Sequence, residues 1–199
     1  MSIGLSALLL GLGCTVRSEA QEEVRASPQA EPVPLGEDGI RFAVIGDYGD
    51  AGVARDDVAN LVRGWDVDFV LTLGDNNYPV GSASTIDANI GAAYHAFIHP
   101  YQGSYGEGAD KMRFFPSLGN HDWARGDIQA HIDYFALPGN ERYYSFTWGP
   151  ASFFAVDSDP HEPDGVTADS VQATWLREAL AASDSPFNVV YMHHPPYSS

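Results

Sequence analysis

The sequence contains little cysteine and little positive charge. Its single cysteine, Cys14, excludes an internal disulfide and a thiolate metal cluster, and it precedes the folded part of the chain. Only 10 Lys and Arg side chains oppose 27 Asp and Glu side chains, which gives a formal net charge of −17. So acidic a surface repels nucleic acids and anionic lipids. We therefore expect no nucleic-acid-binding surface.

The first 38 residues are predicted to lie outside the folded domain. Residues 3–12 are apolar or small and lead to Cys14, which resembles a short export signal with a lipobox. The usual positive charge is absent, because no basic residue precedes Arg17. We expect residues 1–14 to direct export, followed either by lipid attachment at Cys14 or by ordinary cleavage. The protein would then be periplasmic, extracellular or membrane-anchored. Residues 15–38 are rich in Glu, Gln, Ala, Ser and Pro, which is typical of a flexible linker.

Residues 39–199 are sufficient for one domain with a hydrophobic core. Strands are predicted at 40–45, 67–73, 114–118 and 187–192, and a hairpin at 143–148 and 152–156. Helices are predicted at 51–65, 85–98, 127–135 and 168–182. Asp127 is expected to be the N-cap of the third helix, and Val171 and Trp175 to be buried in the fourth. This alternation predicts an α/β fold with a mixed sheet.

Four short polar motifs each follow a predicted strand. They are Gly46-Asp47-Tyr48-Gly49, Gly74-Asp75-Asn76-Asn77-Tyr78, Gly119-Asn120-His121-Asp122 and Met192-His193-His194-Pro195-Pro196. In open α/β sheets, binding sites form beyond the carboxyl ends of the strands. Oxygen and imidazole ligands from four strand ends suit a pair of hard or borderline metal ions. Such paired ions usually serve the hydrolysis of phosphate esters.

In this order the motifs resemble those of the calcineurin-like metallophosphoesterases. Tyr78 narrows the resemblance to the purple acid phosphatase branch, especially its small, tartrate-resistant-like type. The resemblance covers roughly residues 40–199. It implies a two-sheet mixed β-sandwich flanked by helices, and a hydroxide held by the metals that attacks phosphorus.

The resemblance also implies two metal ions, Fe(III) and a divalent ion such as iron, zinc or manganese. The first ion would be held by Asp47, Asp75 and Tyr78. The second would be held by Asp75, Asn120 and His193, so that Asp75 bridges both. A phenol ligand must lose its proton, which a trivalent ion promotes.

His121 is the expected acid of the site, because an imidazole can protonate a leaving alkoxide or hold a phosphate oxygen. Asp122 is expected to orient the His121 ring. Strand alternation sends His193 and His194 to opposite faces, and the resemblance selects His193 as the ligand. For Trp123 we expect packing alone.

Other functions stay open. The substrate of an exported phosphatase of this type would be a small phosphate ester, but a phosphodiesterase or nucleotidase of the same superfamily is an alternative. So is a non-catalytic surface lipoprotein that retains the fold. Asp157 and Asp159 also resemble the nucleophile motif of haloacid-dehalogenase-type phosphatases. A strand-end turn explains that pair better, because the motif comes late and His161 replaces the expected Thr or Val.

One family motif has no counterpart in the sequence. The resemblance calls for a G-H-x-H string after His193 that supplies one histidine to each metal, and none is present. We therefore expect a C-terminally truncated sequence in which the last strands of the fold are missing. We also expect these 199 residues alone to bind metal weakly and to have little activity.

Overall fold

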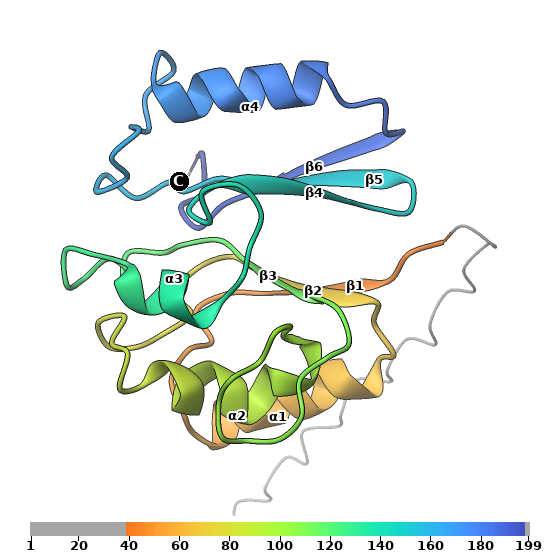
Figure 1. Ribbon diagram of the computed structural model, residues 1–199, viewed down its shortest axis with the longest axis vertical. Coiled ribbons are helices and arrows are strands. Elements are labelled where there is room, and N and C mark those ends of the chain that lie inside the picture. The colour runs from red at the N-terminus through yellow and green to blue at the C-terminus, as the bar shows by residue number, and fades with distance from the viewer. Residues whose placement is uncertain (1–38, 198–199) are drawn as a thin grey trace, which may run out of the picture. The chain divides into compact units, whose positions relative to one another are not determined.

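The structure, a computed structural model, describes residues 39–197 and consists of two facing three-stranded sheets with helices outside them (Figure 1). The predicted α/β class and two-sheet architecture are confirmed. The expected export segment 1–14, linker 15–38 and anchor at Cys14 lie outside the described residues. No helix within residues 39–197 is both long and apolar enough to cross a lipid bilayer.

The first sheet is parallel, with strand order β1-β2-β3. Its strands are β1 (Phe42–Ile45), β2 (Phe69–Thr72) and β3 (Phe114–Pro116). The helix α1 (Val53–Gly64) connects β1 to β2 and lies on the outer side of the sheet (Figure 1). All four residues of β2 are buried, which is why this strand is a continuous apolar run followed by one threonine.

The single helix predicted at 85–98 is wrong in detail. This segment contains the π-helical turn η1 (Asp87–Gly91), the short α2 (Ala92–Tyr94) and the 3₁₀ turn η2 (His95–Phe97). Within the wide turn, the Asn89 amide donates to Asn77 Oδ1 and to the Tyr78 carbonyl, each at 2.8 Å. The wide turn therefore directs a polar side chain at the loop after β2.

The second sheet is mixed, as predicted. Its strands are β4 (Tyr144–Trp148), β5 (Ala151–Ala155) and β6 (Phe187–Tyr191). The first two form the predicted antiparallel hairpin, and β5 pairs with β6 in parallel. The helix α4 (Val171–Ala181) connects β5 to β6 and lies on the outer side of this sheet (Figure 1).

Two predictions about the helices need correction. The helix α3 is Gln129–Tyr134, so that Ile128 is its N-cap, and Asp127 accepts a hydrogen bond from the Gln129 N–H at 3.0 Å. In α4 the buried residue is Gln172, whereas Val171 is 62% exposed and Trp175 is half-buried. The reason is that α4 lies on an outer surface, where much of it stays in contact with solvent.

Aromatic rings between the sheets form the centre of the core. Phe69 of β2 meets Phe153 of β5 edge-to-face at 5.2 Å, and Phe115 of β3 stacks on Phe146 of β4 at 3.7 Å between centroids. Interlocked rings of this kind fix how one sheet lies on the other. They therefore also fix how the strand ends of the two sheets meet.

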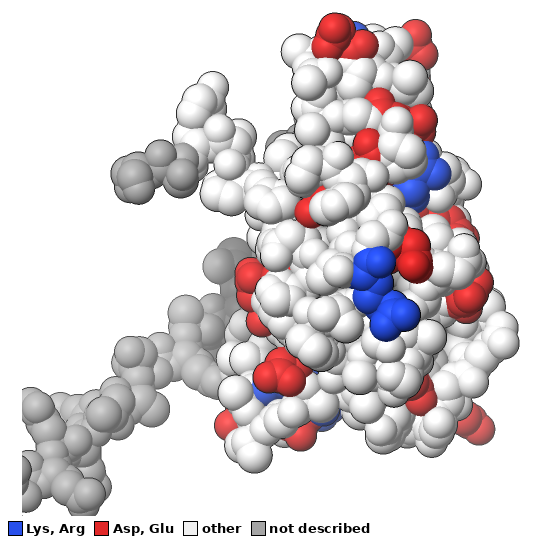
Figure 2. Space-filling view, turned by 90° about the vertical axis from the view of Figure 1, so that its left-hand side faces the viewer, with Lys and Arg blue, Asp and Glu red and all other residues white. Residues whose placement is uncertain are grey.

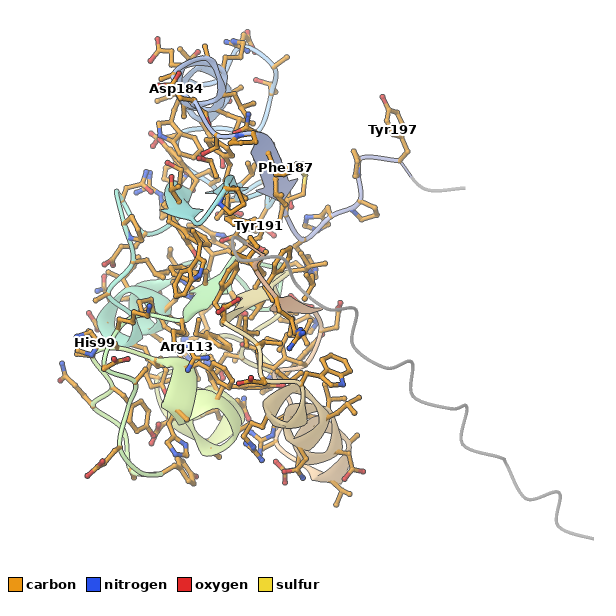
Figure 3. The ribbon with its side chains drawn as sticks, turned by 90° about the vertical axis from the view of Figure 1, so that its right-hand side faces the viewer. His99, Arg113, Asp184, Phe187, Tyr191 and Tyr197 are labelled. Atoms are coloured by element: carbon orange, nitrogen blue, oxygen red, sulfur yellow. The ribbon has the colours of Figure 1, made fainter. Side chains whose placement is uncertain are left out.

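The surface carries the charge imbalance of the sequence. On the face in Figure 2, acidic side chains are scattered and basic ones are few. Strands β1 and β6 are sheet edges. Phe187 at the start of β6 is 64% exposed, whereas Tyr191 at its end is buried (Figure 3).

Candidate metal centre

The strand register places three predicted motifs side by side. Ile45 of β1 pairs with Thr72 of β2, and Thr72 pairs with Pro116 of β3. All three strands end at the same edge, and their loops begin together. The Asp47 N–H donates to the Gly74 carbonyl at 3.2 Å, which joins the first two loops directly.

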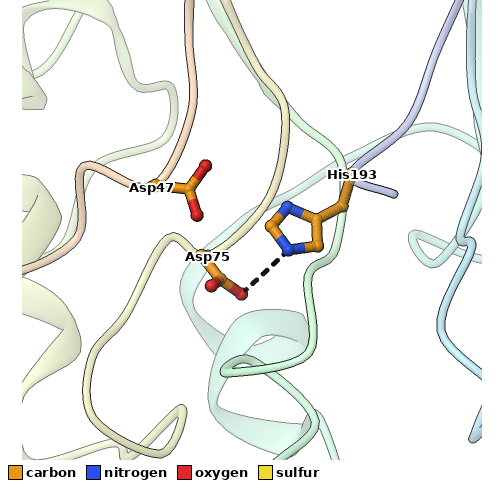
Figure 4. Close-up of side chains that lie close together, drawn as sticks. All are labelled: Asp47, Asp75 and His193. Carbon is orange, nitrogen blue, oxygen red and sulfur yellow. Dashed lines mark ion pairs between the residues drawn. The ribbon is translucent and has the colours of Figure 1, made fainter. Parts of the chain in front are cut away.

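Asp47, Asp75 and His193 converge at this edge (Figure 4). One ligand atom from each lies within 4.8 Å of the others, and His193 Nε2 is 3.6 Å from Asp75 Oδ1. Asp75 is 2% exposed, whereas Asp47 is exposed. The cluster therefore has a buried floor and a side open to solvent.

His193 is oriented by the backbone of the other sheet. Its Nδ1 lies 2.7 Å from the Leu73 carbonyl, which can only accept, so Nδ1 carries the hydrogen. In the neutral ring, Nε2 then keeps its lone pair, and it lies 3.0 Å from Asn120 Oδ1. Two acceptor atoms thus face each other beside a carboxylate, an arrangement that a cation between them would stabilise.

Tyr78 donates to both carboxylates of the cluster. Its hydroxyl lies 2.8 Å from Asp75 Oδ2 and 3.4 Å from Asp47 Oδ1. Burial, and then the hydrogen bond to Asp75, raises the pKa of the Tyr78 phenol. Tyr78 is therefore a neutral donor unless a cation of high charge stabilises the phenolate.

His121 lies beside the cluster, and one of its ring nitrogens has no hydrogen-bond partner among residues 39–197. Its Nδ1 donates to the Pro79 carbonyl at 2.7 Å, and its Nε2 is 4.0 Å from Asp75 Oδ2. The backbone N–H of His121 donates to Asp75 Oδ1 at 2.8 Å, and the ring packs on Tyr78 at 4.3 Å. The side chain is 37% exposed, so solvent or a ligand can reach Nε2.

The predicted role of Asp122 is wrong, because its carboxylate does not contact the His121 ring. Instead it accepts from the Gly119 N–H at 2.9 Å and from the Asn76 amide at 2.9 Å. The Asp122 N–H donates a hydrogen bond to the Gly119 carbonyl, and the resulting turn directs the Asp122 side chain inward. Burial raises the pKa of Asp122 to about 6, although these donors oppose the shift. Asp122 holds the loops after β2 and β3 together.

Asn76, which sequence reasoning missed, is the partner of Asp122 in this support. It is fully buried and accepts from the hydroxyls of Tyr48 and Thr72. It also donates to the Ser117 carbonyl at 2.7 Å. The position of Asn76 in the sequence could have identified it, because it is a polar residue that directly follows the candidate ligand Asp75 at the end of a buried strand.

Two of the four residues other than glycine with positive φ in the described part of the chain are candidate ligands. The backbone angle φ is 53° at Asp47 and 54° at Asp75, values that residues other than glycine rarely adopt. Such residues cost about 1–3 kcal/mol each and cluster at functional sites. Gly119 permits the close approach of the loops, because a Cβ there would lie 2.3 Å from the Asp75 nitrogen.

The structure argues against Asp157 as a nucleophile. Asp157 is 0% exposed, and its Oδ2 accepts from the Trp123 indole N–H at 2.8 Å. Trp123 thus has a polar contact besides packing, which corrects the expectation for it. His194 points away from the cluster, with Nδ1 2.9 Å from Ser158 Oγ.

The residues present fit a bound cation. Within residues 39–197, neither Asp47 nor Asp75 has a Lys or Arg partner, although Asp75 is buried. A buried carboxylate without a compensating cation is costly. Carboxylate, amide and imidazole acceptors all turn toward the same volume, so this donor set suits a hard or borderline metal.

Comparison with known proteins agrees with this chemistry. The family described as calcineurin-like phosphoesterase matches residues 40–199. Purple acid phosphatase 4 of Arabidopsis thaliana is 31% identical over 221 residues, covering 98% of this chain and 62% of the relative. Tartrate-resistant acid phosphatase type 5 of Homo sapiens is 25% identical over 193 residues, covering 80% and 57%. Purple acid phosphatase 7 of Arabidopsis thaliana is 30% identical over 141 residues, covering 65% and 40%. The chain thus spans less than two thirds of each of these relatives.

Proposed function

The chain belongs to the calcineurin-like phosphoesterase family, and on this premise we propose that it is a metal-dependent phosphatase acting on small phosphate esters. The observation that carries the proposal is the convergence of Asp47, Asp75 and His193 from three strand ends. The relatives named as purple or tartrate-resistant acid phosphatases support the same reaction class.

Two ions are assigned to the centre. Asp47, Asp75 and Tyr78 would hold the first, which we propose to be iron(III), because the phenol of Tyr78 must lose its proton to bind and a trivalent ion promotes that loss. Asp75, Asn120 and His193 would hold the second, divalent ion, since the acceptor atoms of Asn120 and His193 face each other at 3.0 Å. When bound, such ions supply Lewis acidity toward the phosphate and a nucleophile from water.

His121 holds the proton that the leaving oxygen needs. The Pro79 carbonyl fixes the ring through Nδ1, so Nε2 is the atom that meets the ester. Tyr78 packs against the ring at 4.3 Å and limits its rotation. The buried pair of Asn76 and Asp122 keeps the two loops in place and does not itself touch substrate.

The test compares leaving groups in the full-length protein loaded with metal. His121→Ala is expected to slow ethyl phosphate by about 10²–10⁴-fold and p-nitrophenyl phosphate far less, because only the poor leaving group needs a proton. His99→Ala is the matched control, since His99 is exposed in another loop. Equal losses on both esters would refute the acid role. A metal-loaded wild type that hydrolyses neither ester would refute the phosphatase assignment.

Export completes the proposal. We propose that residues 1–14 direct the chain out of the cytoplasm, followed either by lipid attachment at Cys14 or by ordinary cleavage. Mass spectrometry of the mature N-terminus distinguishes a lipidated Cys14 from an ordinary signal cut. An unprocessed Met1 in the purified native protein would contradict export by this route.

A further inference from the structure

The buried side chain of Asn89 joins the two loops that carry Asp47 and Tyr78. Its Oδ1 accepts from the Ala51 N–H at 3.2 Å, and Ala51 lies in the loop after β1. Its Nδ2 donates to the Tyr78 carbonyl at 2.8 Å, in the loop after β2. Because an N–H only donates and a carbonyl only accepts, these partners fix which end of the amide faces each loop. Asn89 therefore forms a direct bridge between the two loops.

A third hydrogen bond closes this bridge into a ring. The Tyr78 N–H donates to the Gly49 carbonyl at 2.8 Å, and Gly49 lies two residues before Ala51. Both backbone polar groups of Tyr78 are thus held, one by the loop after β1 and the other by Asn89. The loops also touch, because a Cβ at Gly49 would clash with the Asn76 carbonyl. The backbone from which the Tyr78 phenol extends is therefore fixed from both sides.

Arg55 of α1 holds the π turn that presents Asn89. Its Nη1 donates to the carbonyls of Ala88 and Asn89, each at 2.7 Å, and its side chain is 6% exposed. The second amide hydrogen of Asn89 is donated to Asn77 Oδ1 at 2.8 Å. The backbone carbonyl and both ends of the amide thus have partners. A side chain held in this way keeps one position, which positioning of a neighbouring ligand requires.

The position of Tyr78 affects two parts of the candidate centre. Its hydroxyl donates to Asp75 Oδ2 at 2.8 Å, and its ring packs on His121 at 4.3 Å between centroids. The carbonyl of the next residue, Pro79, accepts from His121 Nδ1 at 2.7 Å. A displacement of the backbone at Tyr78 and Pro79 would therefore move the phenol and the His121 ring together.

We propose that Asn89 is a positioning residue of the metal centre, which fixes where the Tyr78 phenol and the His121 ring lie relative to Asp47 and Asp75. The inference rests on the proposed phosphatase function and adds a residue to its machinery. Asn89 acts only through the backbone of Tyr78 and does not itself contact a bound ester. Removal of such an outer partner typically lowers metal affinity or activity by about 10–100-fold.

The first measurement needs neither metal nor substrate. In the metal-free full-length protein, nuclear Overhauser effects between the ring protons of Tyr78 and His121 report the 4.3 Å ring contact. Asn89→Ala removes the bridge, so these effects should be lost. Asn89→Asp keeps the shape of the side chain and the acceptor for the Ala51 N–H but not the donor to the Tyr78 carbonyl. It should lose the ring contact as well.

Thr85→Val is the matched control. The Thr85 hydroxyl donates to Asn77 Oδ1 at 2.7 Å, so this variant removes a hydrogen bond from the same network but leaves the bonds of Asn89 in place. A second measurement uses the iron-loaded protein with p-nitrophenyl phosphate. N89A should lower kcat about 10–100-fold with KM little changed and should shift any phenolate-to-iron absorption. T85V should keep the wild-type ring contact, kcat and absorption.

Four results would overturn the inference. The first is a ring contact that survives in folded N89A and N89D. The second is an equal loss of that contact in T85V, which indicates general destabilisation. The third is a wild-type kcat in N89A, and the fourth is that neither Asn89 variant folds, which assigns the residue to folding alone. A wild type that hydrolyses no ester would instead refute the proposed function, and the metal-free ring contact would still decide whether Asn89 positions Tyr78.

Discussion

Lowering the pH from 7 to 4 should destabilise the fold through one buried histidine. His131 of α3 is 4% exposed, and its Nε2 has no partner among the described residues. Burial lowers the pKa of His131 from its ordinary 6.5 to about 4, although a hydrogen bond involving the Glu141 backbone opposes the shift. The folded protein therefore keeps this ring neutral over a range in which the unfolded chain binds a proton.

The magnitude follows from the pKa difference. Stability from His131 is fully present above pH 6.5 and falls as the pH drops toward 4, at up to ~1.4 kcal/mol per pH unit. Over the whole window the loss is about 3 kcal/mol. Against a typical unfolding free energy of about 5–15 kcal/mol, this is a large effect.

Buried carboxyl groups act in the opposite direction, so the wild type alone is not informative. Burial raises the pKa of Asp122 to about 6 and also raises the pKa of Asp157. A carboxyl group whose folded pKa is raised favours the folded state more as the pH falls through that value. The informative quantity is the difference between the wild type and a variant that lacks only the histidine.

The assay is equilibrium urea unfolding at several pH values, with a chelator present so that metal release does not contribute. His131→Leu removes the titrating group, so the wild type should lose about 3 kcal/mol relative to the variant between pH 7 and 4. His99→Leu is the control, because His99 is exposed and should leave the pH dependence unchanged. A wild-type-to-H131L difference that is constant over this range would refute the reasoning.

Three other changes test the site and the core. Tyr78→Phe should abolish any visible phenolate-to-iron absorption of the metal-loaded protein, and phosphate-ester turnover is assayed in parallel. An unchanged absorption band would exclude Tyr78 as a ligand. Gly119→Ala places a Cβ 2.3 Å from the Asp75 nitrogen, so metal affinity measured by calorimetry should fall at least tenfold, and wild-type affinity would contradict the close approach. Phe153→Ala should cost about 3–5 kcal/mol in urea unfolding, because Phe153 is 0% exposed; a loss below 1 kcal/mol would mean that the ring is not part of the core.

The sequence was most informative where a strand ends in a polar motif. Asp47 and Asp75 were predicted as neighbours because parallel strands end at one edge, and the register of β1 with β2 places them there. His193, which follows β6 of the other sheet, was selected by the family resemblance. The sequence was least informative about the directions in which side chains point inside loops. Asp122 follows His121 directly, but the hydrogen bond of its N–H to Gly119 turns the carboxylate into the core.

The sequence also did not predict the type of helical turn within 85–98 or the exposure of individual residues in α4. Apolar spacing at 85–98 is compatible with a regular helix, but the buried amide of Asn89 must reach Asn77, and a π turn satisfies both demands. In α4 the spacing identifies an apolar stripe without saying how much of it another layer covers. Val171, in the first turn of that helix, is 62% exposed although it belongs to the stripe.

The two sheets contribute different kinds of side chain to the candidate centre, so the proposed metal binding would depend on the packing between them. Asp47 and Asp75 come from the parallel sheet, whereas His193 comes from the end of β6 in the mixed sheet. His193 Nδ1 forms a hydrogen bond with the Leu73 carbonyl at 2.7 Å. The position of the ring therefore depends on how the two sheets pack against each other. A shift of one sheet against the other by even 1 Å would separate atoms that now lie within 4.8 Å. Phe69 and Phe153, which interlock the sheets, therefore act on the site at a distance, and metal bound there should in turn stabilise the sheet packing.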